Sequence, residues 1–99
     1  MSFQKNTPVV ISNVRFVAAS KPEVATGLLG YVSAVVNSTL ALDGLTLRRT
    51  AEGRLSVSFP SRRDTQGRQW FYLRPLDDAA RREIQHQILG ALGLEEARG

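Results

Sequence analysis

Hydrophobic and polar residues alternate over short stretches through much of the chain, and this period of two predicts β-strands with two different faces. Leu28–Val36 departs from the alternation. It is nearly uncharged and rich in β-branched residues, which is typical of a strand buried on both faces. Ser20–Glu23 contains a proline and is predicted to be a loop. The predicted strands are Val9–Val17, Leu28–Val36, Thr39–Arg49, Arg54–Phe59 and Gln69–Arg74.

The third predicted strand carries a change of register. Leu40 and Leu42 share one face of an extended strand, whereas Leu45 and Leu47 share the other. Either a two-residue hairpin or a β-bulge at Asp43-Gly44 would produce this change. The bulge is favoured, because a hairpin would leave only about three residues on either side of the turn.

The segment after Pro75 predicts one amphipathic helix. Asp77 is placed as its N-cap, and Asp78 adds negative charge at the positive end of the helix dipole. Gly93 is placed to end the helix. The apolar stripe is formed by Ala80, Ile84, Ile88, Leu89, Ala91 and Leu92.

Short connections between the strands define the fold class, because they allow only antiparallel neighbours. We therefore expect an α+β protein, with an antiparallel β-meander of about five strands followed by one C-terminal α-helix, dimerising through the sheet. A single domain is expected over residues 8–93, with flexible termini at 1–7 and 94–99. Leu28–Val36 is more apolar than one helix can cover, which favours a homodimer.

Cysteine usage and hydropathy bear on the location of the protein. A secreted domain this short would usually carry disulfides, so the absence of cysteine favours the cytoplasm. The uncharged segment Val24–Leu42 is about as long as a membrane helix, but it is too polar and too rich in glycine for insertion. We expect a cytoplasmic protein with no membrane association.

The sequence offers no machinery for catalysis. His86 is the only histidine and there is no cysteine, so neither a hydrolytic site nor a tetrahedral zinc site can be assembled. Asp77 and Asp78 are neighbours on a helix, point in different directions and are explained by capping. We expect a protein that is not an enzyme and that has no cofactor, metal or small-molecule substrate.

Positive charge is concentrated in one part of the chain. The formal net charge is +4, whereas Arg48–Arg74 contains seven arginines and two acidic residues, a local charge of +5. An arginine-only basic segment suits bidentate contacts with phosphate or base edges. The arginines of this segment are Arg48, Arg49, Arg54, Arg62, Arg63, Arg68 and Arg74.

One loop and two aromatic residues stand out within this segment. Arg62-Arg63 lies on a predicted loop and Arg68 follows the next turn, so several guanidinium groups can reach one phosphate backbone. Trp70 and Tyr72 are candidates for stacking on unpaired bases. The alternative is a solvated basic rim, with Trp70 and Tyr72 packed under the helix.

A motif in the same region resembles a known family. Phe59–Arg63, with Gly67 and Pro75 at matching distances and a helix around Ile84-Gln85, resembles the stage V sporulation protein G (SpoVG, septation regulator) family. The resemblance covers most of the chain. It implies a small sheet-plus-helix fold, a homodimer, and binding of DNA and sometimes RNA in bacterial gene regulation.

By matched position, the resemblance implies nucleic-acid contacts from Arg62 and Arg63 and adds Arg81 and Arg82 as exposed candidates on the terminal helix. We therefore expect a homodimeric regulator that binds DNA, with RNA as a second candidate, through an arginine-rich loop. The alternative is a protein-interaction adaptor that uses the sheet edge or the Trp70/Tyr72 face.

Overall fold

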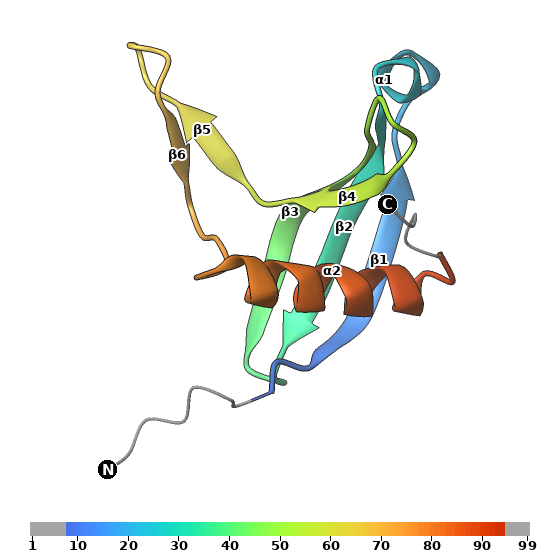
Figure 1. The fold of residues 1–99 in the computed structure, drawn as a ribbon, viewed down its shortest axis with the longest axis vertical. Helices are drawn as coiled ribbons and strands as arrows, with labels where there is room; N and C mark the ends of the chain where they lie inside the picture. Colours follow the sequence, from blue (N-terminus) through green and yellow to red (C-terminus); the bar gives the residue numbers. More distant parts are fainter. Residues whose placement is uncertain (1–7, 95–99) are drawn as a thin grey trace.

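The computed structural model describes residues 8–94 and confirms the α+β fold class (Figure 1). The main sheet has the order β1-β2-β3-β4 with antiparallel neighbours, and the strands β5 and β6 form a separate hairpin. Residues 1–7 and 95–99, predicted to be flexible, lie outside the described part. The elements are β1 (Ile11–Ala18), α1 (Lys21–Ala25), β2 (Leu28–Val36), β3 (Leu40–Arg49), β4 (Leu55–Ser58), β5 (Ser61–Arg63), β6 (Gln69–Phe71) and α2 (Asp78–Ala91).

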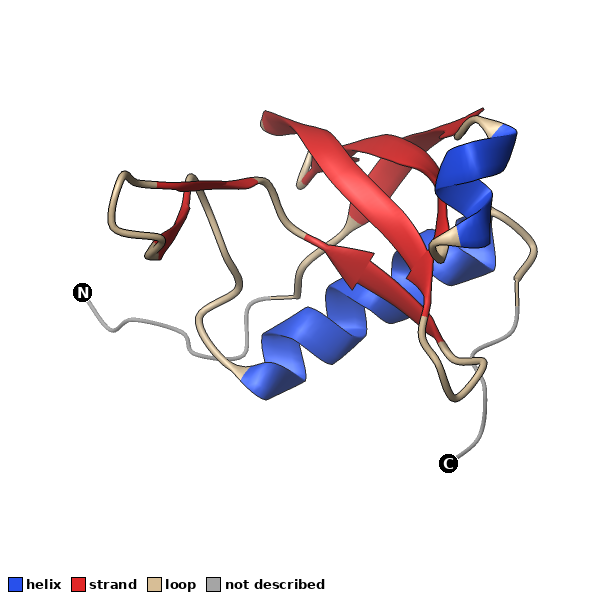
Figure 2. Ribbon diagram, turned by 90° about the horizontal axis from the view of Figure 1, so that it is seen from above, coloured by secondary structure: helices blue, strands red, loops and turns tan. Residues whose placement is uncertain are grey.

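The helix α2 lies across one face of the main sheet (Figure 1). The perpendicular view shows that the sheet curves strongly around the helix (Figure 2). Both ends of α2 are capped as predicted. Asp77 Oδ1 accepts a hydrogen bond from the Ala80 amide at 2.8 Å. Gly93 has a φ of 73°, and the Leu94 amide closes a Schellman motif by donating to the Leu89 carbonyl at 2.8 Å. Within residues 8–94, no helix is long and apolar enough to cross a membrane.

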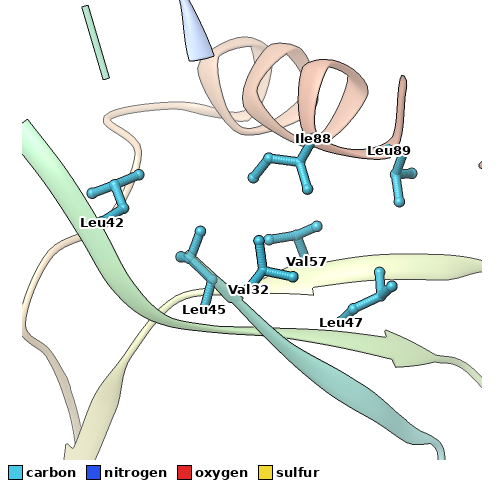
Figure 3. Packing of buried hydrophobic residues seen from close by; sticks show 7 residues of the cluster. All are labelled: Val32, Leu42, Leu45, Leu47, Val57, Ile88 and Leu89. Carbon is cyan, nitrogen blue, oxygen red and sulfur yellow. The ribbon is translucent and has the colours of Figure 1, made fainter. Parts of the chain in front are cut away.

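The hydrophobic core fills the space between the sheet and α2 (Figure 3). Ile88 and Leu89 of the predicted helix stripe are at most 1 % exposed, whereas Ala91 is exposed and does not belong to the core. Burial of a side chain of this size contributes about 1.5–3 kcal/mol. The seven core residues are Val32, Leu42, Leu45, Leu47, Val57, Ile88 and Leu89.

The predicted bulge in β3 is confirmed. Asp43 and Gly44 together stand opposite the single residue Ser33 of β2, and Gly44 has a φ of 79°, a conformation that favours glycine. The extra residue restores the register, so that Leu42 and Leu45 both point into the core. The change of parity in the sequence therefore marks a bulge and not a hairpin.

A second bulge, in β1, is not apparent from the alternating pattern. The register with β2 shifts between Ser12 and Arg15, and Asn13 has a φ of 49°. As a result Val14 packs against the core together with Ile11, although the two residues have opposite parity. The alternating pattern of Val9–Val17 predicts that Val14 and Ile11 lie on opposite faces of the strand, and this prediction is wrong.

The expected loop at Ser20–Glu23 is wrong, because α1 begins there. Its N-terminus is a capping box: the Glu23 amide donates to Ser20 Oγ at 3.4 Å, and the Ser20 amide donates to Glu23 Oε1 at 3.0 Å. The proline that suggested a loop occupies the first turn of the helix, where its missing amide hydrogen costs nothing.

Strand β2 has the predicted bounds but not the predicted burial. Val32 and Ala34 on the core face are 2 % and 3 % exposed, whereas Tyr31 on the other face is 41 % exposed. The prediction that β2 is buried on both faces is therefore wrong for the single chain, because Tyr31 on the second face is exposed.

Two glutamines of α2 hold the two edge strands of the sheet. Gln87 forms a bidentate pair with the first residue of β1 and with Val9, two residues before it: Ile11 N donates to Gln87 Oε1, and Gln87 Nε2 donates to Val9 O, both at 2.7 Å. Gln85 does the same at β4, where Val57 N donates to its Oε1 at 2.9 Å. Each amide group occupies positions that another strand would otherwise fill.

The predicted fifth strand does not join the main sheet, so this part of the predicted meander is wrong. Residues 61–63 pair with residues 69–71 in a hairpin that projects away from the main sheet (Figure 1). Arg62-Arg63, expected on a loop, lies in β5, and the aromatic strand expected over Gln69–Arg74 ends at Phe71. We call residues 61–71 the arm.

Replacing Gln87 by leucine should lower the free energy of unfolding by about 1–3 kcal/mol, because the Ile11 N–H and the Val9 carbonyl lose their partners. Gln85→Leu should act in the same direction at β4. Urea denaturation measures both changes. Gln66→Leu, at an exposed turn, is the matched control and should stay within about 0.5 kcal/mol. Equal stabilities of the Gln87 and Gln66 variants would contradict the edge-holding role.

Candidate nucleic-acid interface

The arm has two distinct faces, which follow from its register. Ser61 pairs with Phe71, and Arg62 pairs with Trp70. Paired residues of antiparallel strands share a face, so Arg62 and Trp70 form one face, which we call the outer face of the arm. Ser61 and Phe71 line a cleft at the root of the arm. The outer face therefore points away from the cleft.

A single carboxylate organises the tip of the arm. Asp64 Oδ1 accepts hydrogen bonds from the amides of Gln66 and Arg68, both at 2.9 Å. Its Oδ2 accepts from Arg68 Nε at 3.0 Å and from the indole Nε1 of Trp70 at 2.9 Å. The indole bond, followed by the Arg68 amide bond, lowers the pKa of Asp64 below its usual value. The turn and both side chains are thus fixed together.

Trp70 is held in place and still accessible. Arg68 Cζ lies 5.6 Å from the centroid of the indole ring, within the range of a cation–π contact. The Trp70 side chain is nevertheless 49 % exposed. Arg62, its cross-strand neighbour, is exposed, and its guanidinium group makes no hydrogen bond or ion pair within residues 8–94. The outer face therefore presents an aromatic ring between two guanidinium groups.

A cleft of about 820 Å³ separates the arm from the body. Its walls combine apolar side chains, such as Phe59 and Pro60, with three arginines from different elements. Arg48 comes from β3, Arg74 from the segment after β6, and Arg81 from α2. This second basic group lies on the side of the arm opposite to the outer face.

The remaining candidate arginines have local partners or lie elsewhere. Arg63 Nη1 donates to the Gly67 carbonyl at 2.8 Å and so closes the arm turn. Arg49 donates across the β3–β4 turn to the Gly53 carbonyl at 3.3 Å, and Arg54 follows in the same turn. On α2, Arg81 and Arg82 both pair with Asp78, at 3.0 and 2.8 Å. The structure thus divides the predicted basic surface into three groups: the outer face of the arm with Arg62 and Arg68, the cleft with Arg48, Arg74 and Arg81, and the β3–β4 turn with Arg49 and Arg54.

The aromatic residues do not pack under the helix, so that interpretation is wrong. Trp70 is 49 % and Tyr72 67 % exposed, and their neighbours Phe71 and Leu73 are 45 % and 39 % exposed. Leu76, just before α2, is 89 % exposed. We call Phe71, Tyr72, Leu73 and Leu76 the apolar strip. All four lie within residues 71–76, and exposed large apolar side chains close together are candidates for an interaction site.

Two carboxylates that organise these groups were not singled out from the sequence for that role. The sequence predicts a turn over Asp64–Gly67, and an aspartate at the start of such a turn is a known signal for an Asx turn. Asp78 was assigned to the helix dipole. Its spacing of three and four residues from Arg81 and Arg82 predicts the two ion pairs. Because these arginines already pair with Asp78, they are expected to bind a ligand more weakly.

No family model matches the chain, and no curated protein matches it.

The Asp64 cluster predicts a pH-dependent change at the tip of the arm. Because its pKa is lowered in the folded chain, the cluster is fully formed above the usual aspartate pKa of about 3.9 and is lost as the pH falls through the lowered value. The resonance of the Trp70 indole N–H should move with a midpoint below that usual value. NMR titration can follow this signal without ambiguity, because the chain has one tryptophan.

Asp64→Asn supplies the control for this titration, since it removes the titrating group and should abolish the transition. A midpoint at or above the usual aspartate value in the unaltered protein would contradict the cluster.

Proposed function

We propose that this chain is a cytoplasmic, nucleic-acid-binding regulatory protein that acts as a homodimer and contacts phosphates mainly through the arm. The observation that carries the proposal is the outer face of the arm, where Arg62 and Arg68 flank an accessible indole ring. Arginines that project from a hairpin suit contacts with a phosphate backbone. DNA is the first candidate ligand and RNA the second.

The sequence motif supports the same proposal. Phe59–Arg63, with Gly67 and Pro75, resembles the SpoVG family, whose members regulate genes in bacteria, and in this chain the motif enters and forms the arm. Arg48 and Arg74 in the cleft can extend the basic surface, whereas Arg81 and Arg82 share Asp78 and contribute less. Arg49 and Arg54 would assist only a ligand that also reaches the β3–β4 turn.

The homodimer is supported by the apolar strip more than by the sheet. The edges β1 and β4 are held by Gln87 and Gln85, so little of the sheet edge needs a second copy. Exposed Phe71 and Leu76 line a cleft that can receive side chains of a partner. A two-fold arrangement would bury the strip of each copy against the other.

The salt dependence of binding tests the phosphate contacts. If about three arginines per subunit contact phosphate, a dimer should give a log–log slope of affinity against salt of roughly −5. The double substitution Arg62→Ala/Arg68→Ala, which removes both arginines of the outer face, should reduce the slope to roughly −2 and weaken binding at low salt. Gel-shift titrations at several salt concentrations measure both.

Arg15→Ala is the matched control, because Arg15 is an exposed arginine of β1 outside the candidate groups. It should leave the slope close to that of the unaltered protein. A flat salt dependence, or equal slopes for the double variant and the control, would count against the proposal.

The dimer is tested separately by sedimentation. Leu76→Asp should shift the protein toward the monomer, since it places a charge in the apolar strip, whereas Leu40→Asp, at another exposed leucine in β3, should not. A sedimentation coefficient that is the same for both variants would place the interface elsewhere.

A second candidate function, a protein-interaction adaptor, is favoured by the same apolar strip, because an unrelated protein could also cover it. Specific capture of one defined protein, with no affinity for pools of mixed DNA or RNA, would support the adaptor and overturn the regulator.

A further inference from the structure

Trp70 differs from the neighbouring exposed Tyr72, just beyond the arm, in being fixed. Its indole N–H donates to Asp64 at 2.9 Å, and the Arg68 guanidinium lies over its ring. The orientation of the ring is therefore set before any ligand arrives. Tyr72, one residue beyond β6, is more exposed than Trp70. Only its backbone is held in place, by a hydrogen bond that its amide donates to the Pro60 carbonyl at 3.0 Å.

The chemistry around Trp70 suits one kind of ligand. Arg68 covers one side of the ring, yet about half of the side chain remains accessible. A planar aromatic group can stack on such a surface, and a base gains more from it when the ring is already held in place. Arg62 opposite the ring makes no side-chain ion pair with any described residue, and Arg68 beside the ring pairs with Asp64 through Nε only. The terminal nitrogens of Arg68 and the Arg62 guanidinium can therefore contact the phosphates on either side of a stacked base.

Duplex DNA does not fit this arrangement well. Its bases are stacked on one another and present only their edges in the grooves, so an indole ring cannot stack on them without unstacking the helix. Phosphate contacts alone would not need a half-exposed tryptophan between the arginines. Unpaired bases, in contrast, offer a free ring face.

We propose that the outer face of the arm binds single-stranded nucleic acid, with one unpaired base stacked on Trp70 and its flanking phosphates held by Arg62 and Arg68. This inference rests on the proposed nucleic-acid-binding function and specifies the class of ligand. Only Trp70 is assigned the stacking role. Tyr72 is assigned to the apolar strip and does not stack on a base.

The single tryptophan makes the test direct, because all indole fluorescence of the chain comes from position 70. Titration with an oligothymidylate single strand should quench this fluorescence as the strand binds. A duplex of the same length should bind more weakly at equal salt and leave the fluorescence nearly unchanged. Binding itself is followed by the anisotropy of a dye on the nucleic acid, so that quenching and affinity are measured independently.

Substitutions separate stacking from a structural role of the ring. Trp70→Leu should weaken binding of the single strand by roughly 5- to 100-fold, the usual effect of losing one stacked base. Trp70→Phe keeps an aromatic face but cannot donate to Asp64, and should retain most of the affinity. If the ring served only to hold the turn, both variants would be equally damaged.

Tyr31→Leu is the matched control, since it removes an exposed aromatic side chain from β2 and should leave the affinity within about twofold. Equal binding of single strand and duplex without quenching would overturn this inference and leave the proposed function standing. Absence of binding to either nucleic acid would overturn both.

Discussion

The rest of the structure depends on how α2 joins the two edges of one curved sheet. Ile88 and Leu89 cover the core, while Gln85 and Gln87, on opposite sides of the helix, bond β4 and β1. These bonds require both edges to approach the same helix, so the sheet must curve, and the bulges in β1 and β3 provide local bends for it. A small domain thereby protects its edges without further strands.

The position of the arm follows from this constraint. Gln85 accepts the Val57 amide hydrogen at the outer edge of β4, where a fifth strand would have to pair. Pro60 then follows β4 and cannot donate a strand hydrogen bond. The chain leaves the sheet, forms a hairpin of its own and returns through Pro75 to α2. The arginines and aromatics of the arm are exposed because the sheet has no place for them.

Much of the fold could be predicted from patterns that act locally. The α2 caps at Asp77 and Gly93 and the bulge at Gly44 each depend on a few neighbouring residues, and all three were predicted correctly. The separate arm could not be predicted, because it depends on Gln85, which is distant in the chain from the strand it protects. The candidate arginines were visible in the sequence. Their division into three groups was not, since it follows from the direction in which the arm projects.

The central claim is that the arm, held outside the sheet, is the surface that meets nucleic acid. The most direct measurement is an NMR titration of backbone amides with a short single-stranded oligonucleotide. The account predicts that the largest chemical-shift changes occur at the amides of residues 61–71 and at the Trp70 indole N–H. The amide resonances of β1, β2 and the second half of α2 should remain unchanged. Shifts centred on α2 or on the exposed face of the sheet, with the arm unaffected, would contradict it.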